Sequence, residues 1–459
     1  MYYLSIDFGT SAIKTAVVDE ELRVKCWNKA EYRYLILPGE KYELRESDLM
    51  SALIRAVKGL DKELLDQVEL VCYDTFSPSL VFMDIDGNLV YPNIITHLDR
   101  RSRKQSEDID QIIGNDAYMK ISGIYPFAGG CSAMTLLWFL QNQPEILDKS
   151  FYVGHLTTLI HKKFTGLWMV DFVNASMLGL YETTRQSGWS ELLLKELGLE
   201  RRLFPDICYP GTVYGTLRKE IAELLGIKEG IPVSVGTNDV AAAQMGAGNK
   251  KAGQIMNIAG SSEMVSILTD KAAVNPSYYL RNAALPGLWQ IYSTTCGGFG
   301  IRWFYEQFCR ELTLDEFYRY EEEEIEKYLE SRQNEVTFTP YLTGDRQSLI
   351  KKTASWNGLT LATSRGQMLV SILVAIQEVI YGTIEKAAKV QELDKVIKVT
   401  GGMITPIYLR LKTKLHPEYV LKQVDDCPIL GNVALARYYQ EDKKYERAER
   451  NYNSGHYSL

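Results

Sequence analysis

The sequence has little of what would place it in a membrane, on a nucleic acid or in a disulfide scaffold. No apolar run approaches the roughly 20 residues that span a bilayer. The net charge of −7 argues against a broad nucleic-acid surface. The seven cysteines are scattered and contain no Cys-x-x-Cys pair, so we expect reduced thiols rather than disulfides or zinc. With no visible signal peptide, these absences predict a cytoplasmic protein.

What is present indicates two α/β domains. The 459 residues exceed what one hydrophobic core usually organises, and 46% hydrophobic with 24% charged residues is typical of globular proteins. The segments SIDFGTSAIKTAVV and MNIAGSSEMVSIL both run apolar strand, small polar turn, apolar strand, about 250 residues apart. This weak internal repeat predicts two similar domains, at residues 1–245 and 246–459.

Each of these turns offers groups that an anion can bind. Small residues let backbone N–H groups approach a phosphate closely, and hydroxyls add donors. Asp7 would repel a phosphate at the first turn unless a cation intervened, and Mg²⁺ binds carboxylate and phosphate oxygens together. The alternative is an ordinary hairpin with a turn aspartate. The candidate phosphate-binding residues are Gly9, Thr10, Ser11 and Lys14 in the first segment and Gly260, Ser261 and Ser262 in the second.

Two further segments have both a structural and a chemical interpretation. In GTNDVAAAQMGAG, Asp239 is either a helix cap, a role that Asn238 could also fill, or a general base that accepts a proton during phosphoryl transfer. In KVIKVTGGMITPIYLRL, a buried strand leads to Gly401 and Gly402 and then to a helix that begins near Thr405. Its glycines would admit a flat ligand against the backbone, or simply form a strand–helix turn.

The order of these segments resembles the FGGY family of carbohydrate kinases, in the sugar kinase/actin/Hsp70 superfamily. The first phosphate motif of the family resembles IDFGTSAIKTAVVD, and its catalytic-aspartate segment resembles PVSVGTNDVAAAQMGAG. Its second phosphate motif resembles NIAGSSEMV, and its adenosine motif resembles VTGGMITPIYLR. Together with weaker matches such as FTGLWMVDFVNAS, the resemblance covers residues 2 to about 437.

The resemblance implies an α/β fold of two ribonuclease H-like (actin-like ATPase) domains with a central cleft. It implies ATP-dependent, Mg²⁺-dependent phosphorylation of a sugar hydroxyl, with sugar bound mainly by the N-terminal domain and ATP by the C-terminal one. Asp239 would be the general base, and Asp7 and Asp239 would lie at the metal. The implied ATP-binding residues are Gly9, Thr10, Ser11, Lys14, Gly260, Ser261, Ser262, Gly401, Gly402 and Thr405.

Departures from the family pattern concentrate on the substrate side. Where pentulose kinases usually carry Gln-Met-His-Gly, this chain reads DTFSPS, and the Trp of a Trp-x-Asp-x-Arg pattern is replaced by His97. An Asp common in the family appears as His155, and Glu378 is a candidate substitute for an acidic position one helical turn earlier. His97 is either structural or substrate-binding, and Asp99 with Arg101 form either an ion pair or a hydroxyl-binding pair. The candidate substrate residues are Asp74, Ser77, Pro78, His97, Asp99, Arg101 and Asp239.

The sequence therefore predicts a kinase of a small sugar or polyol, with a xylulose-like ketopentose as the first expectation. Glycerol, a hexulose or a sugar acid are alternative substrates. The sequence leaves open whether the protein is a homodimer. One rival is an actin- or Hsp70-type nucleotide switch, which would need a partner-binding extension that is not evident. Another is a kinase-inactive sugar-binding regulator, against which the presence of both Asp7 and Asp239 argues.

Overall fold

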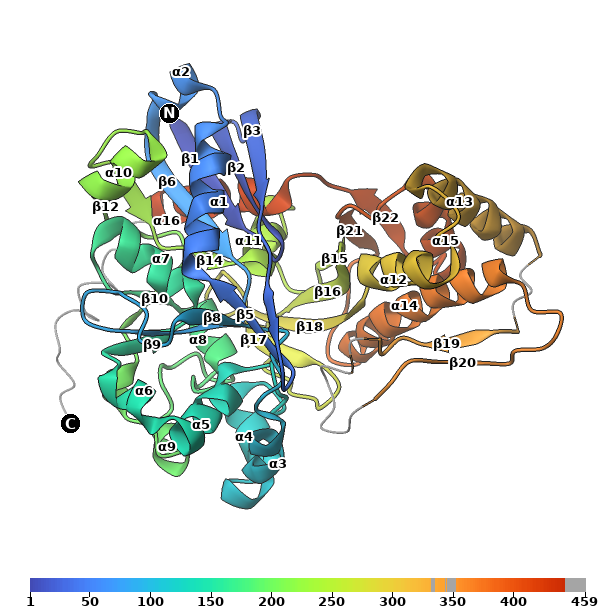
Figure 1. The fold of residues 1–459 in the computed structure, drawn as a ribbon, viewed down its shortest axis with the longest axis horizontal. Helices are drawn as coiled ribbons and strands as arrows, with labels where there is room; N and C mark the ends of the chain where they lie inside the picture. The colour runs from blue at the N-terminus through green and yellow to red at the C-terminus, as the bar shows by residue number, and fades with distance from the viewer. Residues whose placement is uncertain (332–334, 343, 345–351, 442–459) are drawn as a thin grey trace. The chain divides into compact units, whose positions relative to one another are not determined.

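The computed structural model describes residues 1–331, 335–342, 344 and 352–441, and the chain forms two compact units (Figure 1). Unit 1 comprises Met1–Gly248, Arg281–Gly287 and the described chain from Asp426 onward. Unit 2 comprises the described residues of Asn249–Leu280 and Leu288–Asp425. The expected division into 1–245 and 246–459 places the C-terminal helix in the second domain, whereas its contacts group it with the first.

The core of unit 1 is a seven-stranded sheet in the order β12-β13-β6-β1-β2-β3, with β14 also paired to β6. The middle strands are buried on both faces, and they read as near-continuous apolar runs for that reason. β1 pairs antiparallel with β2 and parallel with β6. The strands are β1 (Tyr2–Phe8), β2 (Ala12–Asp19), β3 (Val24–Glu31), β6 (Val68–Thr75), β12 (Val213–Thr216), β13 (Pro232–Ser234) and β14 (Thr237–Asn238).

Smaller sheets and helices complete unit 1. One sheet has the order β4-β5-β8-β7-β9, with β4 (Leu35–Leu37), β5 (Lys41–Arg45), β7 (Ser79–Met83), β8 (Asn93–Thr96) and β9 (Tyr152–Gly154), and another pairs β10 (Val170–Asp171) with β11 (Ile207–Cys208). The helices are α1 (Glu46–Lys58), α2 (Lys62–Leu65), α3 (Arg103–Ile112), α4 (Asn115–Ser122), α5 (Ser132–Asn142), α6 (Pro144–Lys149), α7 (Leu156–Thr165), α8 (Phe172–Leu178), α9 (Glu191–Glu196), η1 (Arg201–Leu203), α10 (Lys219–Leu225), α11 (Asp239–Gly246) and α16 (Cys427–Glu441).

Helices α11 and α16 pack backbone against backbone. A Cβ atom on Gly246 would lie 1.9 Å from the carbonyl oxygen of Cys427, and one on Gly431 would lie 1.8 Å from that of Ala242. Only glycine fits at these two positions. The small residues of α11 thus admit the C-terminal helix, which also packs against β1 and β6 through Ile429 and its neighbours.

Unit 2 contains a second sheet with the same arrangement. Its order is β17-β18-β16-β15-β21-β22, and β15 pairs antiparallel with β16 and parallel with β21, as β1 does with β2 and β6. The strands are β15 (Ile255–Ala259), β16 (Ser262–Thr269), β17 (Tyr279–Asn282), β18 (Trp289–Cys296), β21 (Val396–Thr400) and β22 (Val420–Gln423), beside a hairpin of β19 (Thr337–Thr339) and β20 (Ser355–Asn357). The helices are α12 (Gly298–Phe308), α13 (Leu314–Ser331), α14 (Arg365–Ala388) and α15 (Pro406–Leu415).

Helix α14 is the core helix of unit 2. It begins with a capping box in which Ser364 and Gln367 bond each other's backbone. By length and composition it is the one described helix that could cross a membrane, but 67% of its apolar window is buried inside the protein. Its apolar face is therefore already covered by unit 2.

A buried ion pair fixes the beginning of β16. The Lys412 ammonium donates to Glu263 (2.5 Å), Asn257 Oδ1 (2.8 Å) and Gln377 Oε1 (2.7 Å), and the Tyr408 hydroxyl donates to Glu263 Oε2 (2.7 Å). The side chains of Lys412 and Glu263 are only 1% and 0% exposed. Burial lowers the pKa of Lys412, and the charge of Glu263 opposes this. Each buried charge is thus satisfied only while its partner is present.

We predict that Lys412→Ala lowers the free energy of unfolding by about 3–5 kcal/mol, because it leaves Glu263 charged, buried and unpaired. Urea unfolding followed by circular dichroism measures the change. Arg410→Ala is the matched control, because Arg410 lies on the same helix as Lys412. It removes an exposed ion pair with Glu326 of α13 and should cost less than about 1 kcal/mol. Equal effects of the two variants would contradict the prediction.

Candidate active site

Strand register brings three carboxyl groups together at one edge of the unit 1 sheet. Asp7 on β1 lies beside Asp74 on β6, and Asp74 lies beside Thr237 on β14. Asp239 follows directly as the first residue of α11. The carboxyl ends of neighbouring parallel strands are where α/β folds place their ligands. We call Asp7, Asp74 and Asp239 the acid cluster.

Asp74 is the buried centre of the acid cluster. It is 0% exposed, and Asn432 from α16 donates to its Oδ2 (2.6 Å). Burial, together with the charges of Asp7 and Asp239, raises the pKa of Asp74 well above its usual range. The strand register sets Asp74 directly beside Asp7. Asp74 was expected to contact the substrate, but its burial makes it a partner of Asp7.

Asp7 and Asp239 are the half-buried members of the cluster. Burial raises the pKa of Asp7 to about 6, while Asp74 and Lys14 oppose the rise. Burial and then the charge of Asp7 raise the pKa of Asp239 to about 7, while Arg281 opposes the rise. A carboxylate with a pKa near neutrality suits proton transfer, and the crowded negative charge suits a divalent cation.

Asp239 is not needed as the helix cap. The Asn238 side chain accepts from the backbone N–H groups of Val240 (3.1 Å) and Ala241 (3.4 Å), which caps α11. Asp239 Oδ1 accepts from Asn238 Nδ2 (2.7 Å) and from the Val240 backbone (2.8 Å). These contacts orient the Asp239 carboxyl group and leave the capping role to Asn238.

The first polar turn lies beside Asp7. A Cβ atom on Gly9 would lie 3.4 Å from Asp7 Oδ1, and the Gly9 carbonyl accepts from the Tyr32 hydroxyl. Thr10 is half-buried and Ser11 exposed, so both hydroxyls are accessible. Lys14 forms an ion pair with Asp426 and lies over the Trp27 ring. A phosphate role for Lys14 stays a prediction, because here its charge is paired with a carboxylate.

The predicted pair Asp99 and Arg101 has the contacts of an ion pair. Arg101 donates to Asp99 Oδ1 (2.9 Å) and Oδ2 (2.8 Å), and also to Glu43 and to Tyr91 (3.3 Å). The side chains of Asp99 and Arg101 are each 1% exposed. Of the two alternatives raised by the sequence, the structure therefore favours the ion pair over hydroxyl binding.

The other predicted substrate residues lie on two neighbouring segments. Ser77 is half-buried and Pro78 buried, on the loop that follows β6. His97 is half-buried after β8, and its ring meets Phe76 edge-on at 5.9 Å between centroids. Ser77 donates to Asn174 Oδ1 (2.6 Å), so it belongs to a polar network rather than to an isolated loop.

Sequence reasoning assigned no role to four residues that contact this site. Asp171 and Asn174 connect Ser77 with Thr237, Asn432 bonds Asp74, and Arg281 lies close enough to act on the charge of Asp239. Asp171 and Asn174 fall in the segment FTGLWMVDFVNAS, and the resemblance of this segment to the family could have marked both as candidate site residues. No local sequence signal marked Arg281 or Asn432, because each comes from a distant part of the chain.

The second polar turn lies against two backbone segments of unit 2. The Gly260 carbonyl accepts from the Gly298 N–H (2.9 Å), and the Ser261 carbonyl accepts from the Phe299 N–H (2.9 Å). Gly401 has φ +112°, and a Cβ atom there would lie 2.4 Å from the Ala259 carbonyl oxygen. Gly401 must therefore be glycine for β21 to turn away beside this strand. Thr405 caps α15 by accepting from the Tyr408 N–H (3.3 Å).

An aromatic pocket of about 430 Å³ opens beside this turn. Gly298 and Gly402 form its edge nearest the turn, and Tyr305, Tyr318 and Tyr408 contribute aromatic walls, so we call it the tyrosine pocket. Its volume and apolar walls suit a flat heterocycle. The remaining residues that line it are Ile301, Arg302, Leu314, Phe317, Glu321, Glu322, Met403, Thr405 and Ile407.

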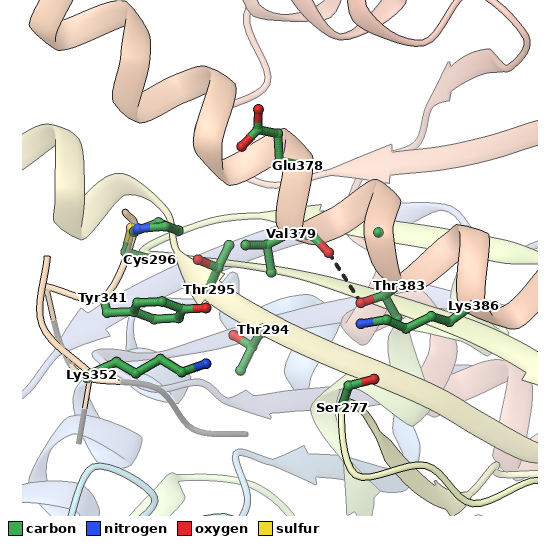
Figure 2. Close-up of a pocket in the computed structure, with 13 residues that line it drawn as sticks. Ser277, Thr294, Thr295, Cys296, Tyr341, Lys352, Glu378, Val379, Thr383 and Lys386 are labelled. Atoms are coloured by element: carbon green, nitrogen blue, oxygen red, sulfur yellow. Dashed lines mark hydrogen bonds between the residues drawn. The ribbon is translucent and has the colours of Figure 1, made fainter. Parts of the chain in front are cut away.

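A second, polar pocket of about 220 Å³ lies between β18 and α14 (Figure 2). Glu378, the proposed substitute for a family acidic residue, lines it together with Lys352 and Lys386. Thr383 on α14 donates to the Val379 carbonyl (3.2 Å), as the dashed line shows. This pocket also contains Pro340, Tyr341 and Gly344, next to residues outside the described part of the chain.

Each unit, taken by itself, offers groups of the kind that a metal or a nucleotide needs. Among the described residues, no three acidic, histidine or cysteine side chains could hold a metal on their own. Mg²⁺ typically takes one or two carboxylates plus phosphate oxygens and water, so Asp7 and Asp239 fit that donor set. The turn at Gly260–Ser262 and the tyrosine pocket fit a triphosphate and its base.

Comparison with known proteins supports the carbohydrate-kinase resemblance. The N-terminal domain of the FGGY family of carbohydrate kinases matches residues 2–246. A xylulose kinase of Lactococcus lactis subsp. lactis (strain IL1403) is 26% identical over 95% of this chain and 87% of its own length. An L-fuculokinase of Escherichia coli O157:H7 is 24% identical over 80% of this chain and 77% of its own length.

The fold also has a close structural neighbour. The crystal structure of ligand-bound xylulose kinase from Lactobacillus acidophilus superposes with a TM-score of 0.84 at 18% identity, covering 96% of this chain and 89% of that chain. This confirms the expected fold of two actin-like ATPase-type domains. Family membership also decides against the nucleotide-switch rival. Because the family match spans more than half of the chain, this protein belongs to the FGGY family of carbohydrate kinases, the ATP- and Mg²⁺-dependent phosphotransferases that act on sugar hydroxyls.

Proposed function

We propose that this kinase phosphorylates a ketopentose such as xylulose, with Asp239 as the general base. The observation that carries the proposal is the acid cluster: Asp239 is half-buried, oriented by Asn238, and has a pKa raised to about 7 beside Asp7. The xylulose kinase relative, which aligns over nearly the whole chain, supports the choice of sugar.

In this mechanism the substrate hydroxyl attacks the γ-phosphorus of ATP while Asp239 accepts its proton. The bond between the γ-phosphorus and the bridging oxygen breaks, and ADP leaves with that electron pair. Bound Mg²⁺ would neutralise charge on the phosphoryl oxygens. Asp7 would hold the cation, with Asp74, whose pKa is raised well above its usual range by burial, as its buried neighbour.

The tyrosine pocket of unit 2 is the proposed site of the adenine base. It adjoins Gly402 and the turn at Gly260–Ser262, where the phosphates would bind. Ser261 and Ser262 would supply hydroxyl donors, as Thr10 and Ser11 would from the first turn.

Glu321 lines the tyrosine pocket and is half-buried. Burial raises the pKa of Glu321 to about 7, and the charge of Glu322 adds to the rise.

A different sugar is the second candidate. Ser77, Pro78 and His97 depart from the pattern of pentulose kinases, and another relative is an L-fuculokinase. A screen of D-xylulose, L-fuculose, glycerol and gluconate by coupled ADP release distinguishes the candidates. Highest kcat/KM on D-xylulose supports the proposal. A clear preference for another compound would identify that compound as the substrate in place of the ketopentose. ADP release that is independent of every sugar would contradict the proposed kinase activity.

We predict that Asp239→Asn lowers kcat by about 10²- to 10⁴-fold, because the amide cannot accept the substrate proton. ATP affinity, measured by calorimetry, should stay near the wild-type value. Asp86→Asn is the control, since Asp86 lies on an exposed turn. Near-normal turnover of Asp239→Asn would mean that the base is elsewhere.

Asp7→Asn should raise the Mg²⁺ concentration needed for half-maximal activity by roughly tenfold, because one carboxylate of the metal site is lost. Initial rates at fixed ATP and varied Mg²⁺ measure this. Asp206→Asn, whose side chain is 81% exposed, is the control for a general loss of negative charge. An unchanged Mg²⁺ curve would reassign Asp7 to a structural role.

Glu321→Gln should flatten the pH dependence of stability. Because the folded-state pKa of Glu321 is raised from 4.5 to about 7, folded protein holds a proton that unfolded protein loses between pH 4.5 and 7. The free energy of unfolding therefore falls as pH rises through that window. Between pH 5 and 8 the variant should lose about 2 kcal/mol less than wild type. Glu330→Gln, exposed on the same helix, should follow wild type; parallel curves for Glu321→Gln would contradict the assignment.

A further inference from the structure

A buried chain of hydrogen bonds in unit 1 leads from Ser77 to the strand that precedes Asp239. Ser77 Oγ donates to Asn174 Oδ1 (2.6 Å), and Asn174 Nδ2 donates to Asp171 Oδ1 (2.6 Å). Thr237 Oγ1 then donates to Asp171 Oδ2 (2.8 Å). Asp171 and Asn174 are 0% exposed and Thr237 is 1% exposed. We call these four residues the Ser77 network.

Asp171 sets the direction of every hydrogen bond in this network. Its carboxylate accepts from the Asn174 backbone N–H (3.3 Å) as the N-cap of α8, and from the Thr237 hydroxyl. Burial raises the pKa of Asp171 to about 6, against the hydrogen bonds from Asn174 and Thr237, so above that pH its carboxylate can only accept. The Asn174 amide nitrogen then faces Asp171. The Asn174 oxygen must then face Ser77, which leaves it an acceptor for the Ser77 proton.

His155 extends the network beyond Asn174. Its Nδ1 lies 3.2 Å from Asn174 Oδ1 and its Nε2 lies 2.8 Å from Ser132 Oγ. With Asn174 oriented as above, Nδ1 carries the proton and Nε2 accepts from Ser132. Complete burial lowers the pKa of His155 to about 3, so the ring is neutral with one N–H. Asn174 Oδ1 therefore accepts from both Ser77 and His155, and both of its lone pairs are used.

The consequence concerns what Ser77 can offer on its other side. A serine hydroxyl has one proton and two lone pairs, and the proton of Ser77 is directed inward to Asn174. Ser77 is half-buried, and it comes two residues after Thr75, which pairs with Asn238, the neighbour of Asp239. Ser77 therefore has only acceptor lone pairs left for a group outside the network, on the loop that directly follows the strand paired with β14.

We propose that Ser77 is a specificity-determining residue that accepts a hydrogen bond from a substrate hydroxyl, and that the Ser77 network thereby selects a donor at this position. A carbonyl or carboxylate oxygen there would face lone pairs and be rejected. The inference rests on the proposed sugar-binding role of this face. It narrows the substrate to one whose group beside Ser77 is a hydroxyl.

The tautomer of His155 tests the direction of the network without any sugar. In the full-length protein labelled with ¹⁵N-histidine, two-bond ¹⁵N–¹H correlation spectra distinguish Nδ1–H from Nε2–H, and His155→Gln assigns the signal. We expect a neutral Nδ1–H ring from pH 7 to 8, above the pKa of Asp171. An Nε2–H ring would mean that Asn174 is turned round and that Ser77 has the opposite polarity, which overturns the inference.

Substrate analogues test the recognition itself. The probes are D-xylulose and, for each non-reacting hydroxyl, its deoxy and deoxyfluoro analogues, since fluorine can accept but not donate a hydrogen bond. For wild type, one position should lose about 10²-fold in kcat/KM with both analogues, because a site built for a hydroxyl rejects a group that cannot donate. Ser77→Ala should remove most of that difference at the same position.

Ser79→Ala is the matched control, because Ser79 is buried nearby but bonds only backbone groups, the Phe76 carbonyl and the Leu156 N–H. It should keep the wild-type pattern of analogues even if stability falls. A fluoro analogue as good as D-xylulose at every position, or an unchanged pattern in Ser77→Ala, would overturn the inference. If D-xylulose is not phosphorylated, the proposed sugar is wrong, and the tautomer of His155 still decides the polarity of Ser77.

Discussion

The unit 1 site depends on the crowding of three carboxyl groups that strand register forces together. Parallel pairing of β1 with β6 sets Asp7 beside Asp74, and pairing of β6 with β14 brings Asp239 to the same edge. Burial raises the pKa of all three acids, and neighbouring carboxylates add to the rise for Asp74 and Asp239. Asp74, the fully buried acid, has its pKa raised well above the usual range, whereas the half-buried Asp7 and Asp239 have pKa values of about 6 and about 7.

This arrangement has a cost in stability that a catalytic site can tolerate. Carboxyl groups whose pKa is raised in the folded state make folding less favourable as pH rises toward neutrality. The cost is offset by elements that need not take part in chemistry, such as the close packing of α11 on α16. Asn432 connects the two, because the helix that packs against α11 also supplies the hydrogen bond to Asp74.

Local sequence patterns predicted the parts of the site that are encoded locally. The strand–turn–strand segments, Asp7 before the first turn, and the choice between Asn238 and Asp239 as helix cap could all be stated from a few neighbouring residues. The hydrogen bond from Asn432 to Asp74 joins residues 358 positions apart, and the neighbouring sequence of either residue does not predict it. Asp99 and Arg101 were ambiguous for a similar reason: Glu43, which completes their ion cluster, lies on another strand.

The two units share a strand arrangement but differ in charge at the end of the strand that precedes each polar turn. Aligning the two turns places Ile258 where unit 1 has Asp7, and Ile258 pairs with Thr400 as Asp7 pairs with Asp74. The buried acid of unit 2, Glu263, is instead neutralised by Lys412.

A phosphate at the turn of unit 2 therefore meets donors without facing an unpaired carboxylate. In unit 1 the same frame carries the acid cluster, in which the pKa values of Asp7 and Asp239 stay raised although Lys14 and Arg281 oppose the rise. The two copies of the frame thus differ in charge at two paired strand positions, where Asp7 and Asp74 of unit 1 correspond to Ile258 and Thr400 of unit 2.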